Sequence, residues 1–245
     1  MPLHALVNEE NIQISDVTLE EAKRLQERIR CEKLSVKMPC CSYKGHLKFS
    51  SRNNPFFCHN RDANCNWAPE TEEHRRIKDL IYRACIAAGF ETKTEYTENG
   101  KWKADVFAKH GNIKIAFEVQ LTNQNYDQTL IRHLKYVEDG VICIWLFKQI
   151  PKVKECLFSN EPNIEKNMYE LMFQNDNFIV KCGSHKPNIS TFITSYLNAL
   201  YRDTIAEPYS DIKIEEIPEW LKWVGIIFLV FLGWAFYKAM KGRRR

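Results

Sequence analysis

The chain has 245 residues, of which 44% are hydrophobic, 27% charged and 12% aromatic. This length and composition exclude wholesale disorder and allow one or two domains, each with a core of its own. Of the 35 basic residues, six lie from Trp220 onward, where no acidic residue occurs, which leaves 29 basic against 31 acidic residues before that point. The net charge of +4 therefore belongs to the C-terminal tail. The rest of the chain is not a generally basic nucleic-acid-binding protein, and any such contact needs a local patch.

The chain contains nine cysteines, and no basic and then apolar run follows Met1. An odd cysteine count without a signal peptide favours reduced thiols in a cytoplasmic setting over a disulfide framework. Five of the nine lie between Cys31 and Cys65, and this density favours metal binding in that part of the chain.

Residues 1–30 are expected to contribute an N-terminal helix. The stretch Thr18-Leu-Glu-Glu21 has the pattern of a capping box, in which the two polar side chains satisfy each other's backbone N–H groups. A helix should therefore begin at this point and run to about Arg30. Residues 1–17 carry no informative pattern.

Residues 31–68 are expected to form a small, turn-rich module with a zinc site. Zinc takes four Cys or His ligands, usually as two close pairs. The favoured ligands are Cys41, Cys58, His59 and Cys65, with Cys31, Cys40 and His46 as alternatives. The competing interpretation is a metal-free module whose cysteines are ordinary small apolar residues.

Residues 69–150 carry the clearest periodic patterns. They predict six elements in the order α-β-β-β-α-β: a helix at about 70–88, strands at 90–96, 103–110 and 113–121, a helix at about 126–138, and a buried strand at 141–147. Pro69 and Gly89 bracket the first helix, and Gly140 ends the second. This order predicts a mixed α/β domain.

The patterns after residue 150 are weaker. Residues 151–218 are expected to form an α/β extension with a helix near 163–174, a strand at 178–182 and a helix near 190–201. Residues 219–245 are expected to form a transmembrane helix with a basic tail. No charge lies from Val224 to Tyr237, and aromatic residues border this apolar centre as they do at bilayer interfaces. A buried or partner-bound apolar helix is the alternative.

The orientation of such an anchor is ambiguous from the sequence. The many thiols place the preceding domain in the cytoplasm, whereas the terminal Lys-Gly-Arg-Arg-Arg favours a cytoplasmic C-terminus. A single span cannot satisfy both, and we favour an inner-membrane protein whose preceding domain is cytoplasmic. Removal of that domain by protease added to intact spheroplasts would contradict this orientation.

Two carboxylates on neighbouring predicted strands form the central functional signal. Glu118 and Gln120 are two residues apart and therefore point to the same face of the strand 113–121, and Asp105 lies in the strand before it. A hairpin brings Asp105 and Glu118 together, where their charges repel unless a cation lies between them. Magnesium is bound through one or two carboxylates together with water and phosphate oxygens, which suits phosphodiester hydrolysis.

The predicted helix 70–88 adds two polar residues to this region. At 100° per residue, Glu70 and His74 extend the apolar stripe instead of opposing it. Charged residues on a core-facing stripe indicate function, since their burial is costly without partners. The alternative is that both lie in an exposed first turn.

At these residues the chain resembles the competence protein CoiA-like nucleases of the PD-(D/E)XK, restriction-endonuclease-like superfamily. The resemblance covers about residues 38–147 and rests on Glu70-Thr71-x-x-His74-x-x-x-Lys78, Lys103-Ala-Asp105-Val, Ile115-Ala-Phe-Glu118-Val-Gln120-Leu-Thr122, Arg132-x-x-x-Tyr136 and Ile144-Trp145. It implies a restriction-endonuclease-like core, with Asp105 and Glu118 as ligands of Mg²⁺ or Mn²⁺ and with Glu70 and Gln120 completing the catalytic set.

The resemblance also identifies supporting residues. Gln120 stands where the superfamily usually has Lys, and the CoiA-like branch is similar in this respect. A glutamine can orient water but supplies no charge, so Lys78 or Lys103 would supply it. Arg132 would contact phosphate, although Tyr136 could simply pack and Arg132 lie at the surface.

The Cys/His module departs from the family pattern. The chain has Met38-Pro39-Cys40-Cys41 where the family has a Cys-Pro-x-Cys knuckle, so Cys31 or His46 would have to replace the missing first cysteine.

Three functions are compatible with these observations. The first is a membrane-anchored, Mg²⁺-dependent nuclease that acts on incoming DNA, during uptake or in anti-phage defence, with protein partners from such a system. The second is a catalytically inactive module that binds nucleic acid or a protein at the membrane. The third is a membrane protein whose soluble domain only scaffolds a larger complex.

Overall fold

A computed structural model describes residues 3–39, 41–60, 65, 70–98, 100–151 and 164–206. The chain divides into two compact units, Met1–Leu200 and Tyr201–Arg245. The first contains all the sheets. Among the described residues no helix combines the length and apolar character needed to cross a bilayer. The proposed anchor, residues 220–240, lies outside the described residues.

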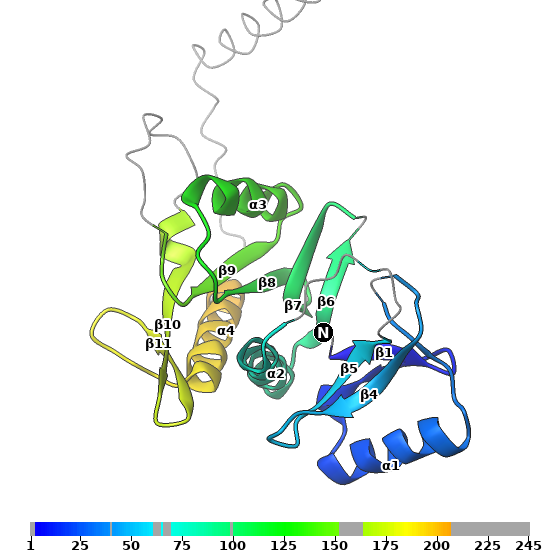
Figure 1. Ribbon diagram of the computed structural model, residues 1–245. Helices are drawn as coiled ribbons and strands as arrows, with labels where there is room; N and C mark the ends of the chain where they lie inside the picture. Colours follow the sequence, from blue (N-terminus) through cyan, green and yellow to red (C-terminus); the bar gives the residue numbers. More distant parts are fainter. Residues whose placement is uncertain are drawn as a thin grey trace, which may run out of the picture. The chain divides into compact units, whose positions relative to one another are not determined.

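A six-stranded mixed sheet forms the centre of the first unit (Figure 1). Its strands, from one edge to the other, are β11 (Asn177–Lys181), β10 (Met168–Gln174), β9 (Ile142–Phe147), β8 (Ile113–Gln120), β7 (Trp102–His110) and β6 (Glu91–Glu98). Strand β9 pairs in parallel with β8 and with β10. The pairs β6–β7, β7–β8 and β10–β11 are antiparallel hairpins.

Helices cover both faces of this sheet (Figure 1). Helices α2 (Glu72–Ala87) and α4 (Ile189–Ala206) pack on one face around Ile115 and Phe117, whereas α3 (Tyr126–Glu138) packs on the other around Ala116 and Trp145. The polar face expected for β8 is therefore buried as well, and Glu118 on it is only 3% exposed.

The N-terminal part forms a separate small core. It contains β1 (His4–Val7), β2 (Glu10–Gln13), a 3-10 turn (Ile14–Asp16), α1 (Leu19–Cys31), β3 (Val36–Lys37) and the hairpin of β4 (Gly45–Phe49) and β5 (Pro55–His59). Phe57, Met38 and Ala5 are buried in this core. The expected capping box is present, with Thr18 and Glu21 bonded in both directions.

Most expected elements between residues 18 and 147 are confirmed. The helix expected near 163–174 is wrong: Ile164–Asn167 is a 3-10 turn, and β10 follows it. Met168 and Tyr169 pair in parallel with Trp145 and Leu146 of β9. Sheet pairing on the open edge of β9 thus outweighs the local helical preference of this stretch.

Residues 1–17 also contain strands that the sequence did not indicate. Asn8 and Glu9 both have positive φ, 50° and 73°, which is the conformation of a two-residue hairpin turn that matches the twist of β1 and β2.

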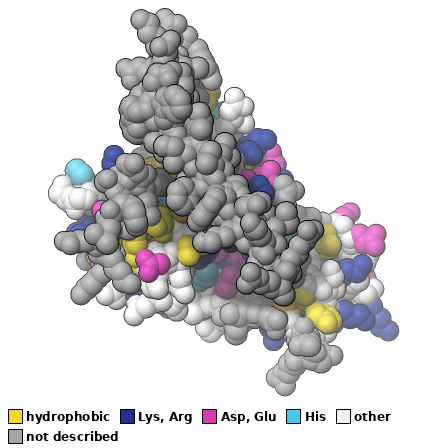
Figure 2. All heavy atoms as spheres, turned by 90° about the horizontal axis from the view of Figure 1, so that it is seen from above, with side chains coloured by type: hydrophobic (Ala, Val, Ile, Leu, Met, Phe, Trp, Pro, Cys, Tyr) yellow, Lys and Arg dark blue, Asp and Glu magenta, His cyan; other side chains and the backbone are white. Residues whose placement is uncertain are grey.

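Basic and acidic side chains lie side by side on the described part of the surface seen from above (Figure 2). This mixture agrees with the near balance of charge before Trp220. A generally basic face is not visible there, so contact with an anionic partner depends on a local site.

Candidate active site

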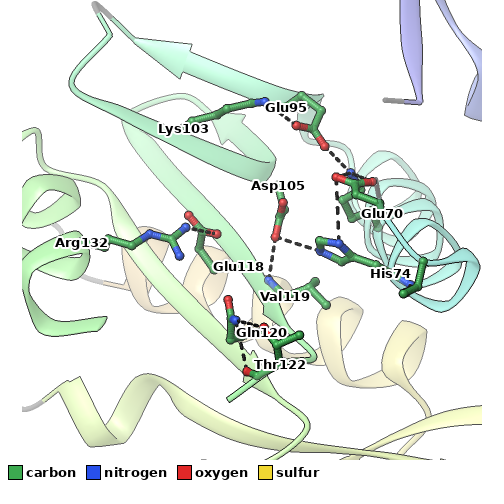
Figure 3. A network of polar contacts seen from close by, with 12 residues as sticks. Glu70, His74, Glu95, Lys103, Asp105, Glu118, Val119, Gln120, Thr122 and Arg132 are labelled. Carbon is green, nitrogen blue, oxygen red and sulfur yellow. Dashed lines mark hydrogen bonds and ion pairs between the residues drawn. The ribbon is translucent and has the colours of Figure 1, made fainter. Parts of the chain in front are cut away.

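Strands β7 and β8 separate at the two carboxylates that the sequence singled out. Their pairing runs from His110↔Ile113 to Val106↔Phe117, and Asp105 and Glu118 are the next facing residues. There the Asp105 side chain replaces the strand backbone as the partner of β8, since its Oδ2 accepts a hydrogen bond from the Val119 N–H at 2.9 Å. The strands therefore open at the position where polar side chains from both sides of the sheet converge (Figure 3).

Strand β6 is also distorted beside Asp105. Its pairing with β7 includes Thr94↔Val106 and Tyr96↔Ala104 but passes over Glu95 and Asp105. Glu95 has a φ of 54°, a left-handed conformation that a glutamate adopts only at a cost. The usual alternation of strand side chains is broken there, because Thr94 and Glu95 are both buried.

The start of α2 differs from the expected one. Thr71 is the N-cap and accepts a hydrogen bond from the His74 N–H at 3.2 Å, so the helix begins at Glu72 and the expectation that Glu70 belongs to it is wrong. Nevertheless, Glu70 is held in place, because Arg75 Nη1 donates to its carbonyl oxygen at 2.7 Å. Its side chain is 10% exposed, which excludes the exposed first turn considered above.

A buried lysine joins the acidic groups from α2 and β6. Lys78 is fully buried, and its Nζ lies 2.8 and 2.7 Å from the two carboxylate oxygens of Glu70 and also contacts Glu95. Lys103 Nζ lies 2.7 Å from the other oxygen of Glu95. Burial acts to lower the pKa of Lys78, but the charges of Glu95 and Glu70 outweigh it and raise the pKa. Lys78 is therefore a permanent cation of the site.

His74 connects α2 with the central carboxylate. Its Nε2 lies 3.3 Å from Asp105 Oδ2, the oxygen that also accepts from Val119. Burial acts to raise the pKa of Asp105, but the hydrogen bond and charge of His74, the charge of Lys78 and the Val119 N–H together hold it at about 2. Asp105 is thus ionised across the physiological range.

Helix α3 holds the second carboxylate. Arg132 Nη2 lies 2.7 Å from Glu118 Oε2, and the Tyr136 hydroxyl donates to Oε1. Arg132 also lies over the Trp145 ring at 4.9 Å, and Tyr136 is 1% exposed. Both residues therefore position Glu118, and neither is merely a packing or surface group.

The buried network has an excess of negative charge. Four carboxylates (Glu70, Glu95, Asp105 and Glu118) face three permanent cations (Lys78, Lys103 and Arg132). Burial and the nearby charge of Asp105 raise the pKa of Glu118 to about 8, despite Arg132 and Tyr136. Such a site needs a proton or a further cation to be neutral.

The oxygen donors in this network suit a hard divalent cation. One carboxylate oxygen from each of Glu70, Glu95 and Asp105 lies within 4.8 Å of the others, while Glu118 faces α3. All donors are carboxylate oxygens, the ligand type that Mg²⁺ and Mn²⁺ prefer. The sequence did not identify Glu95, whose one available signal is that the β6–β7 register places it opposite Asp105.

Gln120 lies beside the carboxylates without bonding to them (Figure 3). Its Nε2 donates to Thr122 Oγ1 at 2.8 Å and to the Thr122 carbonyl at 3.2 Å. Because the amide is neutral, the positive charge of the site comes from Lys78, Lys103 and Arg132.

The raised pKa of Glu118 predicts how stability depends on pH. In metal-free protein, the folded state binds a proton at Glu118 that the unfolded state releases near pH 4.5. The contribution of Glu118 to the free energy of unfolding is therefore fully present below about pH 4.5. It should be lost as the pH rises from there to about 8, by about 1.4 kcal/mol per pH unit. Glu118→Gln should remove this slope. The measurement is denaturant unfolding with a chelator at several pH values; parallel curves for the two proteins would contradict the prediction.

The Cys/His module assembles part of its expected zinc site. Cys41, His59 and Cys65 each offer a ligand atom within 4.8 Å of the others, and Cys41 Sγ lies 3.2 Å from His59 Nε2. Cys58 does not join them, because successive residues of β5 point to opposite faces. The expectation that Cys58 belongs to this set is therefore wrong.

Cys58 and the three alternative ligands are distributed as follows. Cys58 lies opposite His46 in the β4–β5 hairpin, with its Sγ 3.2 Å from His46 Nε2. Cys31 is exposed at the end of α1. Cys40 lies outside the described residues. The three ligands that do come together are Cys41, His59 of β5 and Cys65. Two thiols and an imidazole suit a thiophilic ion such as zinc.

The separation of Cys58 from the other three ligands gives a matched pair of variants. We expect about one equivalent of zinc per chain in purified protein, retained in Cys58→Ser and lost in Cys41→Ser. Elemental analysis measures both. Less than about a tenth of an equivalent in the unmodified chain, or equal zinc in both variants, would contradict the site.

The chain is similar to a known family. The family model described as "Competence protein CoiA, nuclease-like domain" matches residues 70–218, which is more than half of the chain. No curated protein and no solved structure matches the chain.

Proposed function

Because the chain belongs to the family of competence protein CoiA nuclease-like domains, we propose that it is a metal-dependent nuclease that hydrolyses phosphodiester bonds of DNA. The observation that supports this most strongly is the buried cluster of carboxylates with excess negative charge, where β7 and β8 separate. Such carboxylates suit a divalent cation, and the basic side chains beside them suit the phosphate backbone of DNA.

Each side chain of the cluster has a role that follows from its contacts. Asp105 would hold Mg²⁺ or Mn²⁺ with Glu70 and Glu95 in reach. Glu118, bonded to Arg132 and Tyr136 of α3, is the further ligand that the family resemblance implies. When bound, such an ion activates water and polarises a phosphoryl oxygen. His74 and the Val119 N–H fix the orientation of Asp105, while Tyr136 fixes that of Glu118.

The permanent cations would act on the nucleic acid. Arg132, with side-chain exposure of 40%, can reach a phosphate while it stays bonded to Glu118. Lys103 is 38% exposed and bonded to Glu95. Lys78 is fully buried, so it would stabilise the carboxylates and not contact substrate. Gln120, fixed by Thr122, would orient water through its amide oxygen.

One observation favours a second function. Lys78 lies between Glu70 and Glu95, where its ammonium group already neutralises part of the acidic cluster. If this lysine replaces the metal ion, the domain is a non-catalytic module that binds nucleic acid or a protein through its cationic side chains.

Paired isosteric variants separate the two functions. With Mg²⁺ and plasmid DNA, we expect cleavage by the unmodified chain and a loss of at least about a hundredfold in Glu118→Gln and Asp105→Asn. Glu138→Gln is the matched control, since Glu138 lies exposed at the end of α3, the helix whose Arg132 and Tyr136 hold Glu118. Equal cleavage by all variants, or no cleavage with any divalent ion, would support the non-catalytic module.

We also propose that residues 220–240 anchor the protein in the cytoplasmic membrane, where incoming DNA would first meet the domain during uptake or phage infection. The support is the uncharged stretch from Val224 to Tyr237 with its aromatic borders.

The anchor predicts how the full chain fractionates. It should sediment with membranes and resist alkaline extraction, and Ile227→Arg combined with Leu229→Arg should release it, because each arginine costs about 3 kcal/mol at the centre of a span. Phe173→Arg, at an exposed site on β10, is the control. Retention of the double variant would indicate attachment by another route.

A further inference from the structure

A basic pocket opens beside the carboxylates, between the β6–β7 turn and α3. It has a volume of about 360 Å³, and its cations are Lys101, Lys103, Arg132 and Lys135. No carboxylate is among the described residues that line it. In a domain with nearly balanced charge, this is a local concentration of positive charge next to the proposed reaction site.

The four cations form two pairs with different roles. Lys103 and Arg132 are bonded to the site carboxylates Glu95 and Glu118, so they mark the inner end of the pocket. Lys101 pairs with Asp139 at 2.7 Å and is 57% exposed, and Lys135 is exposed on α3. A surface pair like Lys101–Asp139 contributes little energy, so Lys101 can turn to an anion at little cost. The positive charge therefore extends from the carboxylates toward the β6–β7 turn.

The other side of Arg132 has a different character. A second pocket, of about 520 Å³, is lined there by Gln120, Asn123, Gln124 and Gln128, and Arg132 is its one cation among the described residues. Arg132 is thus shared by a cationic wall and an amide wall. The difference in charge distinguishes the two pockets, because an anionic backbone is favoured on the cationic side alone.

The aromatic residues of the basic pocket are not presented for stacking. Trp102 is 5% exposed and donates its Nε1–H to Asp139 at 2.8 Å, and Tyr136 is 1% exposed and bonded to Glu118. Binding of splayed bases depends on exposed aromatic faces. The pocket therefore suits the sugar–phosphate backbone.

We propose that this basic pocket binds the backbone of the nucleic-acid substrate on the β6–β7 side of Arg132, through phosphate contacts of Lys101 and Lys135. This inference rests on the proposed function for the identity of the anion, and it adds the path that the strand takes from the carboxylates. Contacts of this kind position a nucleic acid without reading its sequence.

Salt dependence of binding tests the proposal without any cleavage. Binding of the full chain in detergent to a short, fluorescently labelled DNA duplex is measured by anisotropy with a chelator, over a series of salt concentrations. The combined variant Lys101→Ala and Lys135→Ala should lower the slope of log affinity against log salt by about 2, close to 0.9 for each lost phosphate contact.

Two controls make the result specific. Lys181→Ala removes another exposed lysine, paired with Glu170 at the opposite edge of the sheet, and Gln128→Ala changes the amide wall. Both should keep the slope of the unmodified chain.

The outcomes also separate this proposal from the nuclease function. A reduced slope in the double variant alone supports the basic pocket, even if no protein cleaves DNA. An unchanged slope in the double variant, or an equal reduction in Lys181→Ala, overturns the pocket, even if the unmodified chain cleaves DNA. Absence of any salt-dependent binding by the unmodified chain overturns it as well.

Discussion

The hydrogen bond from the Val119 N–H to the Asp105 carboxylate is the interaction on which the site depends. It replaces strand pairing at the point where β7 and β8 would otherwise continue side by side. A backbone donor that is satisfied by a side chain allows two central strands to separate without an unpaired polar group in the core. The opening that results is filled from one side by α2 and from the other by α3, and each helix brings its own charged residues to the same place.

The charges in this opening have to be considered together. Lys78 and Glu95 would each be very unfavourable alone at their depth, and their mutual contact makes the burial tolerable. Glu118 is less well compensated. Its pKa is raised, because its partners on α3 do not offset both burial and the charge of Asp105. A proton and a divalent cation are therefore alternatives for the same deficit of positive charge. Such a competition would join the pH dependence of stability to the metal chemistry that the family implies.

The sequence predicted the parts of the site that depend on local periodicity. Alternation placed Glu118 and Gln120 on one face, and helical spacing directed His74 toward the sheet, where its ring contacts Asp105. Glu95 could not be found this way, because its left-handed backbone breaks the alternation on which strand predictions rest. The helix predicted near 163–174 was wrong for a related reason: the strand conformation of Met168–Gln174 comes from pairing with β9, a neighbour that is distant in sequence. Glu70 is shielded from solvent as expected although it precedes the helix, since Arg75 of α2 donates to its carbonyl oxygen.

Arg75 also explains why the N-terminal module belongs with this site. Its guanidinium group lies 4.2 Å over the Phe56 ring of β5 while it donates to the Glu70 carbonyl. Glu72, in the first turn of α2, accepts hydrogen bonds from Ser50 and Asn54 of the β4–β5 hairpin at 2.9 and 3.0 Å. The hairpin that carries His59 thus contacts the start of α2 at Glu72 and Arg75, and Cys65 precedes Glu70 by five residues. A metal ion held by Cys41, His59 and Cys65 would restrain the chain that leads into Glu70. In this arrangement the module would act on the carboxylate cluster through the position of Glu70, without contributing a ligand to it.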